Sequence, residues 1–326
     1  MRGGLTAFVA TPAARGSRNG NRVTALRWAK RLRELGWHVR IGEQWSGEAC
    51  DVLIALHARR SHASVERHAE RCPDDPRVVT LTGTDVYGDL NADAQAQASL
   101  DLATRLVVLQ PLALRELPDR VKAKARTIAQ SATAPPDALH LGAPGAFIVC
   151  VLGHLRDVKD PLLAAKAVGQ LPESSRIQVL HLGGAPDERW RALAEATMLA
   201  TPRWQWLGNR PRREALRILA GADLLVLTSV VEGGANAVTE AIACDVPVMS
   251  TRIDGSIGIL GADYPGYFAV GDAQGLARGL LACETEPGFL EALQRRCQGL
   301  RALVEPAHER ACWHDLLAEI VPRLQG

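Results

Sequence analysis

The chain has 326 residues, which corresponds to about two domains at roughly 150 residues per domain. Its composition is 47% hydrophobic and 23% charged, a globular balance that excludes a disordered or fibrous protein. The formal net charge is +2, with 20 Lys/Arg against 15 Asp/Glu in residues 1–140 and 18 against 21 in residues 141–326. This modest excess does not fit a nucleic-acid partner, but it suits a local site for a small anion.

In the first half of the chain, aliphatic runs typical of strands alternate with helical patterns. The clearest helix is 21–35, where apolar residues recur at three-residue spacing and Gly36 ends the pattern. The predicted strands are Leu5–Ala10, His38–Ile41, Asp51–Leu56, Val78–Thr82, Leu106–Leu109 and Thr127–Ala129.

A loop over Ser131–Gly145, with three prolines and two glycines, predicts a domain boundary. The alternation then restarts, with strands at Phe147–Leu152, Ile177–Leu182, Trp204–Leu207, Leu224–Leu227 and Val246–Ser250. Helices are predicted at Pro161–Gly169, Asp187–Leu199, Arg212–Ala220, Ala235–Ala243 and Ala273–Cys283, followed by an all-helical tail. We therefore expect an N-terminal domain at 1–140, a second at 141–305, and a C-terminal helix at 306–326 that crosses back to the first.

Near-continuous aliphatic strands alternating with helices are typical of parallel sheets covered on both faces. The fold class expected is α/β, with two doubly wound, Rossmann-like parallel-sheet domains facing a cleft. No apolar run approaches the roughly 20 residues of a membrane span, and the apolar run near the N-terminus is too short for a signal peptide. We therefore expect a cytoplasmic protein without stable membrane insertion.

Several common site motifs are absent. GxGxxG, GxxxxGK[ST], HExxH, GxSxG and DxD do not occur, which argues against a dinucleotide oxidoreductase, a P-loop enzyme, and a metal-held nucleotide diphosphate. The seven cysteines form no CxxC pair, so we interpret them as free thiols and expect neither a disulfide framework nor a metal site.

The most informative stretch follows the strand that ends near Thr228. A glycine pair precedes a predicted helix, which places backbone N–H groups and the helix dipole beside an open strand end, an arrangement that suits a phosphate. Glu232 lies in the loop and Glu240 inside the helix, so both carboxylates can accept hydrogen bonds from hydroxyl groups. The remaining candidates for donor binding here are Gly233, Gly234, Ala235 and Asn236.

A second candidate lies between the strand at Phe147–Leu152 and Pro161. Arg156 and Lys159 can converge on a diphosphate and replace a metal ion, although a solvated basic turn is the competing interpretation.

Loops after the first-domain strands supply the candidates for an anionic acceptor. The loop after the first strand contains glycines and arginines that can present N–H groups and charge to an anion, although a plain exposed turn has the same composition. His57 follows the third strand and is a candidate for proton transfer, although a histidine at a strand end is often structural. The residues proposed to bind the acceptor anion are Arg18, Asn19, His57, Arg59, Arg60, Thr84 and Asp85.

The pattern SxxEGxxxxxxEAxAxxxPV from Ser229 resembles the donor site of family 4 glycosyltransferases of the GT-B fold. The resemblance implies that Glu232 lies by the donor sugar and that Glu240 binds the ribose hydroxyls of a nucleotide. It also implies that Gly16 and Ser17 reach the donor phosphates across the cleft, and that a loop with Asn209 and Arg210 contacts the base. Family 4 enzymes usually have arginine where this chain has His154, so the role of His154 stays open and Arg156 takes over the charge.

Several segments together are similar to the selenosugar synthases of selenoneine biosynthesis, namely GSRNGNRVTALRWAKRLRELG, ALHARRS, LTGTDVYGDL, GHLRDVKDP and VEGGANAVTEA. This resemblance implies a cofactor-free, metal-independent enzyme that joins a sugar from UDP-N-acetylglucosamine or UDP-glucose to selenophosphate. Arg156, Lys159 and Glu232 would then act in catalysis with His57. Two alternatives stay open, an ordinary family 4 transferase with a hydroxyl acceptor and a non-catalytic nucleotide-sugar binder. The oligomeric state is not predicted.

Overall fold

The computed structural model describes residues 4–17, 19–83, 85–90 and 92–324. The chain divides into two compact units, one comprising Met1–Ser131 with Pro306–Gly326 and the other Ala132–Glu305. Each unit contains one six-stranded sheet. Within the described residues, no helix combines the length and apolar character that crossing a membrane requires.

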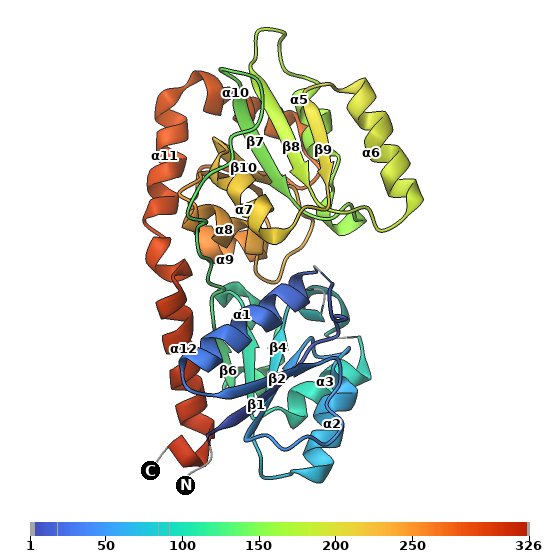
Figure 1. Ribbon diagram of the computed structural model, residues 1–326, viewed down its shortest axis with the longest axis vertical. Coiled ribbons are helices and arrows are strands. Elements are labelled where there is room, and N and C mark those ends of the chain that lie inside the picture. The colour runs from blue at the N-terminus through green and yellow to red at the C-terminus, as the bar shows by residue number, and fades with distance from the viewer. Residues whose placement is uncertain (1–3, 18, 84, 91, 325–326) are drawn as a thin grey trace. The chain divides into compact units, whose positions relative to one another are not determined.

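The first unit is built on a sheet of strand order β2-β1-β3-β4-β5-β6, in which all neighbours are parallel (Figure 1). Its strands are β1 (Thr6–Ala10), β2 (His38–Gly42), β3 (Val52–Leu56), β4 (Arg77–Leu81), β5 (Arg105–Val108) and β6 (Ala125–Thr127). Its helices are α1 (Gly20–Glu34), α2 (His62–Arg71), α3 (Ala94–Leu102), α4 (Asp119–Lys122) and α12 (Pro306–Ile320), with short turns of other helix types at Asp85–Asp89, Pro111–Glu116 and Pro322–Leu324.

Helix α1 follows the predicted periodicity and packs against α12, which it meets at a steep angle in Figure 1. The Asn19 side chain caps α1 by accepting a hydrogen bond from the backbone N–H of Arg22 at 3.0 Å. Trp28 of α1 and Trp313 of α12 meet edge to face with ring centroids 4.8 Å apart. The buried Glu309 carboxylate accepts a hydrogen bond from Trp28 Nε1 at 2.8 Å, so residues 306–320 belong to the first unit.

The second unit has strand order β12-β11-β10-β7-β8-β9, again with all neighbours parallel. Its strands are β7 (Phe147–Leu152), β8 (Ile177–Leu182), β9 (Trp204–Gly208), β10 (Leu224–Leu227), β11 (Val248–Thr251) and β12 (Tyr267–Phe268). Its helices are α5 (Leu163–Val168), α6 (Glu188–Ala200), α7 (Arg212–Ala220), α8 (Asn236–Ala243), α9 (Asp254–Leu260), α10 (Ala273–Thr285) and α11 (Pro287–Gln298), with 3₁₀ helices η3 (Asp157–Lys159) and η4 (Arg301–Val304).

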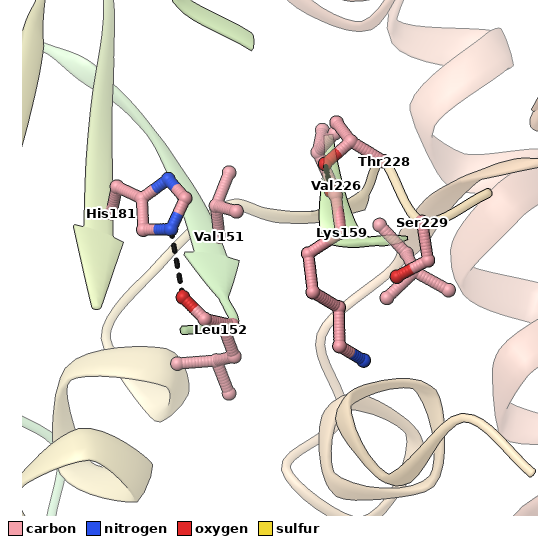
Figure 2. A pocket seen from close by; sticks show the side chains of 9 residues that line it. Val151, Leu152, Lys159, His181, Val226, Thr228 and Ser229 are labelled. Atoms are coloured by element: carbon pink, nitrogen blue, oxygen red, sulfur yellow. Dashed lines mark hydrogen bonds between the residues drawn. The ribbon is translucent and has the colours of Figure 1, made fainter. Parts of the chain in front are cut away.

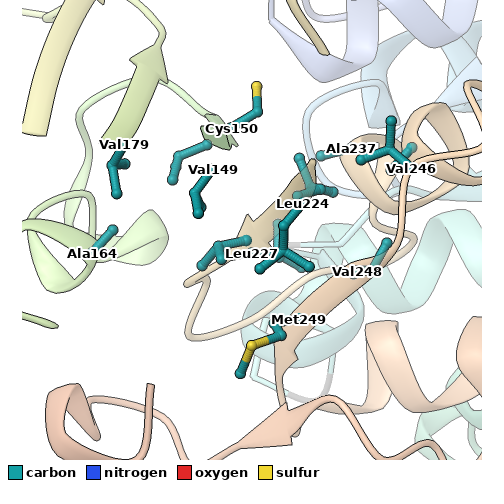
Figure 3. Close-up of a cluster of buried hydrophobic side chains, with 14 of the residues drawn as sticks. Val149, Cys150, Ala164, Val179, Leu224, Leu227, Ala237, Val246, Val248 and Met249 are labelled. Carbon is teal, nitrogen blue, oxygen red and sulfur yellow. The ribbon is translucent and has the colours of Figure 1, made fainter. Parts of the chain in front are cut away.

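The core of the second unit explains why its strands are aliphatic throughout. Figure 3 shows Val149 of β7, Leu224 and Leu227 of β10, and Met249 of β11 in one cluster, and each is buried. Consecutive residues of a strand point to opposite faces, so a strand buried along its whole length must be covered on both faces. The prediction of two doubly wound parallel sheets is thus confirmed.

Some predicted boundaries differ from the structure. The helix after β7 begins at Leu163 rather than Pro161, because Asp160 has a φ of 38° and interrupts the helical path after η3. Strand β11 begins at Val248 rather than Val246, after Pro247, which lacks the N–H that a sheet requires. The predicted helical tail consists of α11, η4 and α12 in succession.

Residues 132–140, placed by the sequence in the N-terminal domain, lie in the second unit. The backbone N–H of Ala132 donates to the carbonyl of Val304 at 3.0 Å, and that of Leu139 donates to the carbonyl of Arg217 at 2.8 Å. These bonds fix the linker on the second unit.

Candidate functional site

The loops after β7 and β10 bring Lys159 and Glu232 together at the carboxyl end of the second sheet. Lys159 Nζ forms an ion pair with Glu232 Oε1, and both side chains are mostly buried. Ser229 Oγ donates a hydrogen bond of 2.7 Å to the same carboxylate oxygen. Thr228 Oγ1 donates to the Lys159 carbonyl at 2.7 Å, so side-chain and backbone contacts both join the two loops.

A small pocket lies beneath these loops (Figure 2), with Lys159 and Ser229 on one side and His181 on the other. Its volume of about 10 Å³ has room for one water molecule. His181 Nε2 donates to the Gly153 carbonyl at 2.9 Å, and burial lowers the pKa of His181 to about 4, so the ring is neutral. A ligand as large as a nucleotide therefore has to bind outside this pocket, above the strand ends.

Glu240 lies on α8 and is only 5% exposed. Its Oε1 is 2.5 Å from Nη1 of Arg212, the first residue of α7. The sequence pointed instead to Arg210, whose guanidinium donates to the Leu207 carbonyl at 2.9 Å and pairs with Glu214 at 3.3 Å. Arg212 was missed because its partner is distant in sequence, but α7 follows β9, whose carboxyl end lies at the same sheet edge.

The start of α8 has no side-chain cap. The loop through the buried Gly233 and the partly exposed Gly234 reaches Ala235, which stands at the N-cap position and has no side-chain oxygen to cap the helix. Asn236 begins the helix. Backbone N–H groups at an uncapped helix N-terminus attract anions.

Two glycines allow the loops of the site to approach one another. A Cβ atom on Gly183, after β8, would lie 1.9 Å from the carbonyl oxygen of Gly153, after β7. A Cβ atom on Gly255, in the first turn of α9, would lie 2.2 Å from the carbonyl oxygen of Glu232. Both neighbours are backbone atoms, so the positions require glycine for close packing.

The remaining residues of the β7 loop differ in their surroundings. His154 Nδ1 accepts a hydrogen bond from the backbone N–H of Gly184 at 2.9 Å, which ties the β7 loop to the β8 loop. Arg156 is exposed, and its carbonyl accepts a hydrogen bond from the backbone N–H of Lys159 at 2.8 Å. Its side chain does not cap η3. Asn209 is exposed and lies near His154, since both approach the Cβ position of Gly184, at 3.3 and 3.5 Å.

In the first unit, His57 and Asp85 lie together at the carboxyl ends of β3 and β4. His57 is buried and has a φ of 74°, a strained conformation for a residue other than glycine. Its Nδ1 is 3.8 Å from Asp85 Oδ2. Asp85 is fully buried and accepts four backbone N–H groups, from Ala58, Thr82, Gly83 and Val86. Asp85 therefore positions both loops rather than offering its carboxylate to a ligand.

The other first-unit candidates lie on the same two loops and on the loop after β1. Arg59 is partly exposed and Arg60 is exposed. Gly16 has a φ of 91°, and Ser17 Oγ is buried without a hydrogen-bond partner among the described residues. Asn19 accepts the α1 capping bond with its side-chain oxygen. Two predicted acceptor residues, Arg18 and Thr84, lie outside the described residues.

Residues 140–298 match the family Glycosyl transferases group 1. Sucrose-phosphate synthase from Thermosynechococcus elongatus is 15% identical and superposes with a TM-score of 0.78 over 98% of this chain and 99% of that one. HepE from Anabaena, solved in complex with UDP-glucose, is 13% identical and superposes with a TM-score of 0.76 over 97% of this chain and all of its own. The chain thus has the GT-B fold, and most of its second unit matches the Glycosyl transferases group 1 family.

Proposed function

We propose that the chain is a glycosyltransferase that binds a UDP-sugar at the carboxyl end of the second sheet. The observation that carries the proposal is the pairing of one buried and one mostly buried carboxylate with two cations, beside a helix N-terminus that has no side-chain cap. Lys159 pairs with Glu232, and Arg212 pairs with Glu240. The match of residues 140–298 to a glycosyltransferase family supports this activity, and solved proteins of similar fold contain UDP or UDP-glucose.

In this proposal Glu240 accepts hydrogen bonds from the ribose hydroxyls, which requires Arg212 to release its carboxylate. Lys159, Arg156 and the N–H groups at the start of α8 stabilise the negative charge that develops on the departing diphosphate. Glu232 orients Lys159 before the diphosphate binds and then faces the donor sugar. No metal ion is required, because these cations supply the positive charge.

For the acceptor, we propose selenophosphate. Its selenium attacks the anomeric carbon as the bond to the diphosphate breaks, and water then cleaves the selenium–phosphorus bond to give a 1-selenosugar and phosphate. The support is the sequence resemblance to selenosugar synthases and the excess of positive charge in residues 1–140. The loops with His57, Arg59 and Arg60 can bind phosphate oxygens through guanidinium forks while selenium stays free to attack.

The decisive experiment incubates the full chain with UDP-glucose or UDP-N-acetylglucosamine and one of four acceptors: selenophosphate, thiophosphate, phosphate or a sugar alcohol. Mass spectrometry then identifies the product. A selenosugar with stoichiometric UDP supports the proposal, whereas turnover only with the hydroxyl acceptor identifies an ordinary transferase. Tight UDP-sugar binding without turnover on any acceptor would indicate a non-catalytic binder.

The acceptor site is tested with Arg59→Gln and Arg60→Gln, and with Arg40→Gln as a control on the exposed face of edge strand β2. Losing one charge-assisted hydrogen bond of about 1.5–3 kcal/mol should raise the KM for selenophosphate at least about tenfold. The KM for the UDP-sugar and all constants of the control should change little. If the loop variants lose only UDP-sugar affinity, these arginines belong to the donor site.

A further inference from the structure

A second group of chemically reactive side chains lies in the first unit, away from the loops described above. Among the residues that the structure describes, one ligand atom from each of His68, Cys72 and Asp75 lies within 4.8 Å of the others. Helix α2 runs from the carboxyl end of β3 to the amino end of β4. His68 lies in its last turn, and Cys72 and Asp75 follow its end. The group is therefore at the edge of the sheet opposite to His57.

The backbone holds two of these residues in place. The N–H of Cys72 donates to the His68 carbonyl at 2.8 Å, which completes the last turn of α2, and the N–H of Asp75 donates to the Cys72 carbonyl at 3.2 Å. The Arg77 guanidinium donates to the carbonyls of Cys72 and Asp75, at 2.9 Å each. The loop is thus fixed by its own backbone, with the thiol and carboxylate side chains at its surface.

His68 is the buried member of the group. Its ring packs edge to face on Trp45, with centroids 4.8 Å apart, and its Nε2 lies 3.7 Å from Cys50 Sγ. Its Nδ1 is buried and has no hydrogen-bond partner among the described residues.

We propose that His68, Cys72 and Asp75 bind one zinc ion. Imidazole nitrogen, thiolate sulfur and carboxylate oxygen are the ligands that zinc prefers. The hydrogen bond from the Cys72 N–H to the His68 carbonyl places these two residues one turn apart, at the end of α2. The contact between Nε2 and Cys50 orients the ring and leaves the unpartnered Nδ1 as the ligand atom. Binding converts the Cys72 thiol into a thiolate and releases its proton to solvent.

The prediction that the chain has no metal site rested on the absence of a CxxC pair. That argument addresses only ligand pairs made of neighbouring cysteines, whereas this group takes one cysteine from the end of a helix and one carboxylate from the following loop. The proposed zinc ion is separate from the donor site and is independent of the metal-free transfer reaction proposed above.

The chain provides an internal control. His308 and Cys312 of α12 have the same spacing as His68 and Cys72, and Cys312 Sγ lies 3.7 Å from His308 Nε2. Within the described residues, no third ligand joins that pair in a comparable group. Comparing the two pairs therefore measures what the carboxylate of Asp75 adds to zinc binding by a thiol and an imidazole.

The test measures zinc by mass spectrometry in the full chain, purified under reducing conditions and dialysed against a weak chelator. We expect about one zinc ion per chain for the wild type and for Cys312→Ser. Removing a residue that only hydrogen-bonds to a metal ligand costs roughly 10–100-fold in metal affinity. Cys72→Ser and Asp75→Asn each remove a ligand itself, so each should weaken zinc affinity by more than that. Cobalt(II) added to zinc-free protein should give a thiolate-to-metal absorption band that Cys72→Ser removes.

Asp75→Asn preserves side-chain size, and an unchanged circular dichroism spectrum will show that this variant folds. Zinc-free wild type that gains no cobalt band would overturn the proposal. Equal loss of zinc in Cys312→Ser and Cys72→Ser would also overturn it, because it would mean nonspecific binding to exposed thiols. Since zinc content is measured without substrate, failure of the glycosyltransferase proposal would leave this result unaffected.

Discussion

Gly255 supports the proposed donor site through a backbone contact, and Gly255→Ala is the sharpest test of that support. The new Cβ atom would lie 2.2 Å from the Glu232 carbonyl oxygen, while ordinary contact begins at 3.4 Å. The two atoms must therefore separate by about 1.2 Å, the difference between these distances. Because the second atom belongs to the backbone, a side-chain rotation cannot relieve the clash.

A displacement of this size affects Glu232 and, through its ion pair, Lys159. Misplacing a catalytic group by about 1 Å can cost a reaction about 100-fold in rate, equivalent to about 2.7 kcal/mol of transition-state stabilisation. We therefore expect kcat/KM for UDP-sugar turnover to fall about 100-fold in Gly255→Ala. The assay is UDP release with saturating acceptor, combined with calorimetric titration of UDP.

The matched control is Gly288→Ala, in the first turn of α11, where a Cβ atom meets nothing within 4 Å. Both variants add one methyl group to a helical glycine, so the difference between them isolates the contact with Glu232. Overpacking also costs stability, typically about 1–3 kcal/mol, so the assay is run well below each unfolding midpoint. A folded Gly255→Ala protein with the same kcat/KM as Gly288→Ala would refute the reasoning.

Three further predictions follow from the second unit. Glu240→Gln should lower UDP affinity about tenfold or more in calorimetry, because the ribose hydroxyls lose a charged acceptor, while Glu214→Gln on α7 should not. Lys159→Ala should lower kcat about 100-fold, and wild-type turnover should be the same with and without added Mg²⁺. The pKa of His181 is lowered by burial to about 4 in the folded chain, against an ordinary value of 6.5. Acid therefore favours the unfolded chain, so His181 should account for about 2 kcal/mol of the stability lost between pH 7 and 5 in urea unfolding. His181→Gln should lack that part of the loss.

The sequence predicts the strands of this protein better than the loops that join them. Strands at Phe147–Leu152, Ile177–Leu182 and Leu224–Leu227 have the predicted bounds, because burial on both faces demands unbroken aliphatic runs. The two-residue β12 was missed, since two residues carry no periodicity. The helix at Asp254–Leu260 was also missed, because its glycines are unfavourable in a helix and it is defined by packing.

The candidate site shows the same division between local pattern and long-range contact. Glu232 and Glu240 were found because they belong to one short motif after a strand. Arg212 has no such motif, and its importance is visible only through the 2.5 Å contact with Glu240. Gly255 is a similar case. A glycine is required at this position only because the backbone of Glu232 lies so close to it. Contacts between distant loops depend on the assembled sheet and therefore cannot be predicted from spacing.

The two ion pairs have a consequence for how the proposed donor site works. An unpaired carboxylate would be costly to bury, so without a ligand Glu232 and Glu240 each need a cation. In the proposed function, a diphosphate competes with Glu232 for Lys159, and ribose hydroxyls compete with Arg212 for Glu240. Substrate binding is then an exchange of partners rather than an addition of charge. The affinity for the substrate then depends on the difference between the old and the new contacts. Because the carboxylates hold both cations at the site beforehand, each cation is in place before the diphosphate begins to leave.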